Sequence, residues 1–176
     1  MPEPTQPTPI LDDATLAFAA RVFDYARTGD SARLDELLAG GLPANLRNHA
    51  GDSLLMLASY HGHLDTARLL LERGADAELR NARGQTPLAG AAFKGDLPMI
   101  ELLLDHGADV EGASPDGRTA LMIAAMFNRS AIVERLLARG ADPQARDAGG
   151  ATPLSAARMM GAVDTQALLA RLGEVR

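Results

Sequence analysis

A Gly-Ala-Asp triplet recurs in this chain at a constant interval of 33 residues, at positions 74–76, 107–109 and 140–142. In the same register, a Ser or Thr followed by two largely apolar residues recurs at 53–55, 86–88, 119–121 and 152–154. A fixed period of this length is typical of a solenoid, in which one supersecondary unit is repeated and stacked. The sequence therefore predicts four copies that begin at Asn48, Asn81, Ser114 and Asp147.

Each copy carries the signals of two short helices. A polar residue and a glycine form a turn, and the Ser or Thr that follows is a preferred N-cap of a helix. Pro87 and Pro153 suit the first helical position, where the backbone N–H has no partner within the helix. A second helix is predicted from the leucines at 69–71, 102–104 and 136–137. Because no single copy can bury both of its faces, we expect stability to come from stacking on neighbours.

The turn glycine, the Thr-Pro-Leu of 86–88 and the Gly-Ala-Asp triplets closely resemble the ankyrin-repeat family, and the resemblance covers residues 48–176. It implies an all-α fold, an L-shaped stack of antiparallel helix pairs with projecting β-turn tips. It also implies a role in protein recognition without chemistry of its own. The heavy use of Ala, Arg and Gly resembles bacterial members of the family.

The sequence predicts one domain at 12–176, because a chain of 176 residues suffices for a single hydrophobic core. Residues 1–11 are Pro-rich and are expected to form a disordered tail. We expect about five repeats, including divergent capping repeats at both ends. Their predicted limits are 12–47, 48–80, 81–113, 114–146 and 147–176.

Three departures from the repeat pattern carry further expectations. Asp12 is expected to cap a longer first helix that runs to about Arg27. The last repeat is expected to be truncated, with a short second helix and a polar outer face, because polar residues such as Gln166 replace apolar ones. Asn128 replaces a glycine and Arg135 replaces a leucine, so the repeat at 114–146 is expected to be less stable than the repeat at 81–113.

Composition disfavours several functional classes. The formal net charge of −6 argues against a nucleic-acid partner, and the absence of cysteine excludes disulfides, thiolate metal ligands and thiol nucleophiles. Charged residues interrupt every window long enough to span a membrane, and no signal peptide is evident. We therefore expect a cytoplasmic protein that has no membrane association, no cofactor and no catalytic site.

One row of residues is the candidate partner-binding surface. In the family, the turn tips and the exposed flank of each first helix face a groove, so residues at one repeat position lie side by side. Tyr60 and Phe93 are the predicted anchors for a helix or loop of a partner. The alternative is that these side chains only shield the seams between helices. The row consists of Met56, Tyr60, His61, Phe93, Lys94, Met122, Met126, Phe127, Met159 and Met160.

A second row lies just before the turns, at Arg47, Arg80 and Arg146. With Arg83 and Arg118, which belong to the candidate partner-binding set, it would form a basic rim that favours an acidic partner. Solvated turn charges are the preferred interpretation of this row, because exposed ion pairs contribute little.

The histidines, His49, His61, His63 and His106, raise the alternative of a metal-binding or small-molecule-binding stress accessory protein. A packing role is preferred, because His63 occupies a position where the family commonly has a packed histidine and no carboxylate partner is evident. The leading hypothesis is a non-catalytic adaptor or inhibitor that binds a protein partner. We expect a monomer, with weak self-association through the Met-rich groove as a further alternative.

Overall fold

The computed structural model describes residues 12–174, so the tail predicted to be disordered, residues 1–11, lies outside the described part. Within that part the chain forms ten helices and two isolated β-bridges, Arg47–Ser53 and Ala113–Thr119. None of these helices is long and apolar enough to cross a bilayer. The helices are α1 (Asp13–Thr28), α2 (Ser31–Ala39), α3 (Leu54–Tyr60), α4 (Leu64–Glu72), α5 (Pro87–Lys94), α6 (Leu97–Asp105), α7 (Ala120–Met126), α8 (Ser130–Ala138), α9 (Pro153–Met159) and α10 (Val163–Glu174).

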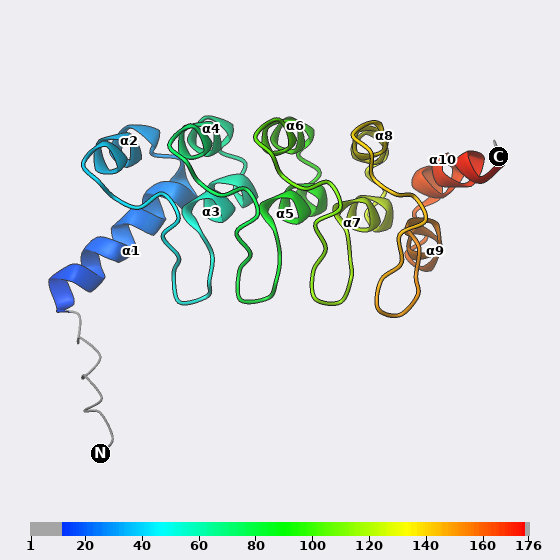
Figure 1. The fold of residues 1–176 in the computed structure, drawn as a ribbon, viewed down its shortest axis with the longest axis horizontal. Coiled ribbons are helices and arrows are strands. Elements are labelled where there is room, and N and C mark those ends of the chain that lie inside the picture. The colour runs from blue at the N-terminus through cyan, green and yellow to red at the C-terminus, as the bar shows by residue number, and fades with distance from the viewer. Residues whose placement is uncertain (1–11, 175–176) are drawn as a thin grey trace, which may run out of the picture.

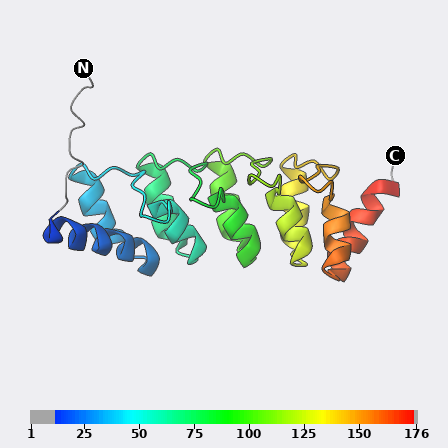
Figure 2. The same cartoon turned by 90° about the horizontal axis from the view of Figure 1, so that it is seen from below.

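The helices form two layers. The first helices of the pairs contact one another in chain order from α1 to α9, and the second helices do so from α2 to α10. Figure 1 shows both layers, with the long loops extending from one side and the two ends of the chain at opposite ends of the stack. Seen from below, α1 runs obliquely to the other first helices (Figure 2). The predicted all-α solenoid is confirmed.

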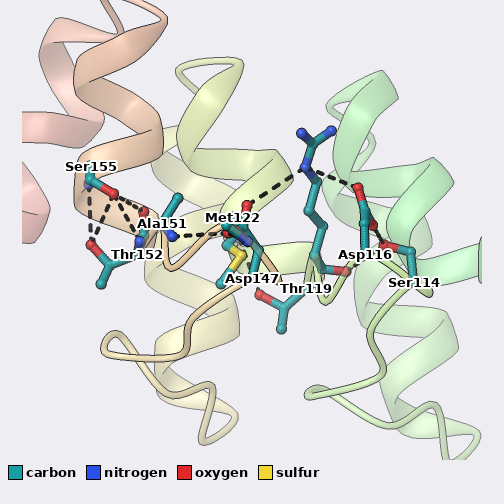
Figure 3. A network of polar contacts seen from close by, with 10 residues as sticks. Ser114, Asp116, Thr119, Met122, Asp147, Ala151, Thr152 and Ser155 are labelled. Carbon is teal, nitrogen blue, oxygen red and sulfur yellow. Dashed lines mark hydrogen bonds and ion pairs between the residues drawn. The ribbon is translucent and has the colours of Figure 1, made fainter.

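Each of the four first helices from α3 to α9 begins at a hydroxyl N-cap. The cap oxygen accepts the backbone N–H three residues later, at 3.0–3.3 Å, which satisfies one of the unpaired donors at the helix start. Figure 3 shows two of these caps, Thr119 with Met122 and Thr152 with Ser155. The caps are Ser53, Thr86, Thr119 and Thr152.

The hydrophobic core extends through all the repeats. Its first helices contribute small residues and its second helices contribute large ones. The central alanines of the first helices are fully buried and let neighbouring helices approach closely: Ala58, Ala91, Ala124 and Ala157. Leu70, Leu103 and Leu136 of the second helices are also fully buried. These leucines supply much of the apolar area, at about 25 cal/mol for each Å² removed from water.

The first helix, α1, agrees with the sequence prediction, and the last helix, α10, does not. Asp12 caps α1 by accepting the N–H of Thr15 at 2.7 Å, and the helix ends at Thr28, as the sequence predicts. The prediction of a short, polar final helix is wrong. With 12 residues α10 exceeds the nine of α4, α6 and α8, and Val163 at its start is 71% exposed. The end face of the last pair is therefore partly apolar.

Asn128 has a role that the repeat pattern did not reveal. It is the one residue other than glycine with a positive φ among those described, at 57°. Its side-chain oxygen accepts the N–H groups of Asp164 and Thr165, at 3.0 and 3.1 Å, and so caps the start of α10 from the preceding repeat. The expectation of a less stable repeat at 114–146 rested partly on this replacement of glycine, whose left-handed backbone is accompanied here by two hydrogen bonds to the next repeat.

The loops that follow the second helices are tied together by a second set of polar contacts. One side-chain oxygen in each repeat accepts a backbone N–H of the next repeat, at 2.7–2.9 Å. This ladder of hydrogen bonds joins each loop to the loop of the next repeat. Its members are Asn45 with Asp76, Glu78 with Asp109, and Glu111 with Asp142.

The ladder makes stability depend on pH at Glu78. Burial raises the pKa of this carboxyl above its ordinary value of 4.5, and the negative charges of Asp109 and Asp76 add to the effect, against the hydrogen bond from Asp109 and the charge of Arg80. Because the folded-state pKa is the higher one, the group's stabilising contribution is complete below 4.5 and is lost as the pH rises through the raised value.

We therefore expect Glu78→Gln to raise the free energy of unfolding slightly at neutral pH, since the amide oxygen still accepts the N–H of Asp109. Urea denaturation near neutral pH and again below the ordinary glutamate pKa measures the effect. The gain should shrink on acidification, and an equal gain at both pH values would contradict this account.

Candidate partner-binding groove

A groove of about 750 Å³ lies between the turn tips and the first helices of three consecutive repeats. Its floor and one wall come from α3, α5 and α7, whose exposed flanks lie next to one another. The other wall comes from the tips at 52, 81–85 and 114–118. Binding sites in proteins are concave and mostly apolar with a few polar groups, and this groove has that form.

Three aromatic side chains form a half-exposed row along the helix wall. Tyr60, Phe93 and Phe127 are 38%, 39% and 38% exposed. The rings of Phe93 and Phe127 lie edge to face with centroids 4.8 Å apart, and the Lys94 Nζ lies 4.9 Å from the centroid of the Tyr60 ring. Both contacts join a residue to the one 34 positions later, so side chains of consecutive repeats meet along this wall. One contact is between two aromatic rings and the other between a ring and an ammonium group.

The groove does not contain every residue of the predicted row. Met56 and Met122 are only 5% and 1% exposed, so they belong to the core rather than to the accessible surface, although Met56 underlies the groove. Each sits three residues after its N-cap, in the first turn of its helix. Met126 is half-buried and lines the groove.

Other predicted residues are accessible but lie at its margin or beyond it. Met159 and Met160 are exposed in the last pair and do not line the groove. Lys94 is exposed and contacts the Tyr60 ring from the side. The structure therefore brings together Tyr60, His61, Phe93, Met126, Phe127, Arg83 and Arg118 around one groove.

The tips carry polar side chains whose hydrogen bonds and ion pairs are mostly made with one another. Asn81 donates to Asp52 and to Gln85, both at 3.1 Å. At the next tip, Ser114 donates to Asp116, as Figure 3 shows. The Arg118 guanidinium lies 3.3 Å from Asp116 and 3.9 Å from Asp147.

Asp116 is thereby kept ionised. The hydrogen bond from Ser114 is the main cause that lowers its pKa, and the charge of Arg118 adds to it. Both carboxylates of this rim, Asp52 and Asp116, are thus engaged by neighbouring side chains of the chain itself.

The arginines of the second row donate hydrogen bonds to backbone carbonyls. The Arg47 guanidinium donates to the carbonyl of Arg80, and the Arg80 guanidinium donates to the carbonyl of Ala113, each in the following repeat. Arg146 donates to the carbonyl of Gly150 at 3.0 Å. Arg47 and Arg80 therefore join adjacent tips, a role that sequence alone does not reveal because the acceptors are backbone carbonyls.

The histidines have local structural roles. The Nε2 of His63 lies 2.7 Å from the carbonyl oxygen of Arg27, and the Nδ1 of His106 lies 2.9 Å from that of Leu102. Burial, followed by the charges of His63, Lys94 and Arg27, lowers the pKa of His61, so its ring is neutral near pH 7. Between residues 12 and 174, no three His, Asp or Glu side chains are grouped so as to hold a metal ion.

Sequence reasoning missed the centre of the groove floor, where Ala89 and Gly90 lie. The missed signal was available by aligning the copies, because the equivalent positions in the flanking repeats are Met56 and Leu57 on one side and Met122 and Ile123 on the other. Gly90 lies inside α5, where glycine costs stability relative to alanine.

We expect Gly90→Ala to raise the free energy of unfolding by about 0.5–1 kcal/mol. A Cβ at this position would meet the Tyr60 ring at 3.5 Å and the Met56 sulfur at 4.0 Å, which are ordinary contacts. Urea denaturation checks the value. A destabilised variant would show that packing, and not accessibility of the groove, requires a glycine here.

Comparisons with known proteins agree with this architecture. A family model described as ankyrin repeats in three copies matches residues 18–113, and a second, described as ankyrin repeats in many copies, matches residues 103–157. A curated Pseudomonas aeruginosa protein named for its ankyrin repeats is 66% identical over 63 residues, which are 36% of this chain and 37% of that protein. The match thus spans little more than a third of that relative.

Ankyrin repeats are generally modules for binding other proteins and generally act as non-catalytic scaffolds. The first family model alone covers more than half of the chain. With its capped first helices, buried alanines and paired second helices in the same register, this chain belongs to the ankyrin-repeat family.

Proposed function

We propose that this chain is a non-catalytic adaptor or inhibitor that holds a partner protein in its groove. The observation that carries the proposal is the aromatic row of Tyr60, Phe93 and Phe127, whose half-exposed rings all line the same groove. Scattered surface hydrophobes are normal in soluble proteins, but contiguous apolar patches usually mark interfaces.

The aromatic row also has the chemistry of an interface centre. Aromatic side chains bury a large area at small entropic cost and dominate binding energy when a polar rim surrounds them. Here the polar groups are supplied by the tips, where the exposed Gln85 and Asp116 line the wall opposite the aromatic row. A partner that covers the wall would remove these rings from water while the rim stays in contact with solvent.

The test is affinity capture from a lysate of the source organism, with the wild-type chain compared with Tyr60→Ala/Phe93→Ala. We expect the double variant to lose the captured partner by at least about tenfold, because two central rings are removed. The matched control is Leu16→Ala/Phe18→Ala, which removes two exposed apolar side chains of α1 outside the groove. Circular dichroism establishes that all variants are folded. Equal capture by the two double variants would refute the proposal.

A further inference from the structure

At the centre of the groove, one repeat has small residues at the floor positions where its two neighbours have large ones. Ala89 and Gly90 occupy the positions held by Met56 and Leu57 in the preceding repeat. In the following repeat the equivalent positions hold Met122 and Ile123. All three repeats contribute to the same 750 Å³ groove, so the small pair leaves space between two larger flanks.

The absence of a side chain at Gly90 is not required by packing. A Cβ there would meet only the Tyr60 ring at 3.5 Å and the Met56 sulfur at 4.0 Å, and the backbone of α5 is helical. The glycine also weakens a helix of eight residues. What it does provide is room beside the rings of Tyr60 and Phe93.

The walls of this space select an apolar occupant. The side chains of Leu57, Ile123 and Met126 line the same groove as Gly90, together with the aromatic rings of Tyr60 and Phe93. A single large apolar side chain inserted here would contact carbon on most sides, which is the arrangement found at the centre of tight interfaces.

Two exposed cations lie at the groove, where Arg83 lines it and Lys94 stands at its margin with Nζ over the Tyr60 ring. Within residues 12–174, neither forms an ion pair with a carboxylate. Of the two carboxylates that line the groove, Asp116 is paired with Arg118, and Asp52 is half-buried and accepts a hydrogen bond from Asn81. The exposed charges without an ion pair at this groove are therefore positive, although the formal net charge of the chain is −6. Such a surface is complementary to an acidic partner.

We propose that the partner presents an acidic peptide segment that inserts one large apolar side chain above Gly90, while its carboxylates contact Arg83 and Lys94. This inference rests on the proposed function and specifies the chemistry of the segment that the groove accepts. The apolar anchor supplies affinity, and the carboxylates supply selection against neutral and basic segments.

The probe is a displayed library of random peptides, selected on the intact wild-type chain. We expect the enriched peptides to share one Leu, Met, Ile or Phe with Asp or Glu nearby. Raising the salt concentration should weaken their binding, because screening reduces the attraction to Arg83 and Lys94. Enrichment of neutral or basic peptides, or no enrichment, would overturn the inference.

Synthetic copies of the enriched peptides are then titrated against Gly90→Leu, which fills the space with the side chain that Leu57 supplies in the preceding repeat. We expect affinity to fall by at least about tenfold. The matched control is Ala131→Leu, which places a leucine side chain on the exposed surface of α8 and should leave affinity unchanged. Gly90→Ala, expected to fold at least as well as the wild type, should give a smaller decrease.

The outcomes separate this inference from the proposed function. Peptides that bind Gly90→Leu normally but are lost on Tyr60→Ala/Phe93→Ala would overturn the anchor space and leave the groove as a binding site. Peptides that bind both variants normally would overturn both proposals. Charge reversal at Arg83 and Lys94 without loss of affinity would overturn the acidic chemistry of the partner.

Discussion

Replacing Leu103 with alanine is expected to lower the free energy of unfolding by about 3 kcal/mol. The side chain is fully buried in α6, which contacts α4, α5 and α8, so the cavity would lie at the centre of the stack. Neighbouring helices on three sides restrict collapse into the cavity, and both the transfer energy and the packing contacts are lost. Equilibrium urea denaturation followed by circular dichroism measures the change.

The control for this substitution is Leu16→Ala, which removes the same atoms from a side chain that is 52% exposed in α1. It should change stability by less than about 0.5 kcal/mol, as surface substitutions usually do. Similar losses from the two substitutions would mean that the second helices do not carry the core. For Leu103→Ala we expect the urea midpoint to fall while the dependence of the unfolding free energy on urea concentration stays constant, since the surface area exposed on unfolding changes little.

The architecture could be predicted from sequence because its determinants are local and repeated. Thr86 and Pro87 start a helix by backbone chemistry that is independent of the rest of the chain, and the same signals return one period later. Asp12 was identifiable as a cap for the same reason. The length of α10 was not predictable in this way, because no residue of a following repeat marks where that helix should end.

The site was predicted less well, because it depends on contacts between repeats. The row at Tyr60 and Phe93 follows from repeat position alone and lies on an accessible wall. Met56 lies one turn before Tyr60 on nearly the same face of α3, but it is only 5% exposed. A Cβ at Gly90 of the next repeat would lie 4.0 Å from its sulfur, and such a contact between repeats cannot be seen in the linear sequence. The free charge of Arg83 and the bracing by Arg47 are fixed by neighbours that the linear sequence does not identify.

Gly51→Ala is expected to cost about 3–4 kcal/mol, far more than a usual glycine substitution at a turn. Gly51 has φ of 76° at the first tip, where any other L-residue is strained by about 1–2 kcal/mol. In addition, a Cβ would lie only 2.6 Å from the backbone nitrogen of Ala82 in the next tip. That nitrogen donates to the carbonyl of Ala50 at 3.1 Å, so the new methyl group would force the two tips apart and break their hydrogen bond.

Gly74→Ala separates the two contributions. Gly74 has φ of 89°, yet a Cβ there would meet no atom within 4 Å, so only the backbone strain of about 1–2 kcal/mol should appear. The difference between the two variants, measured by urea denaturation, is therefore the energy of packing one tip against the next, about 2 kcal/mol. Equal losses would show that the tips are independent of one another. A large difference would mean that the polar wall of the groove is held by contacts between repeats, which keeps Asn81 and Arg83 in fixed positions before any partner binds.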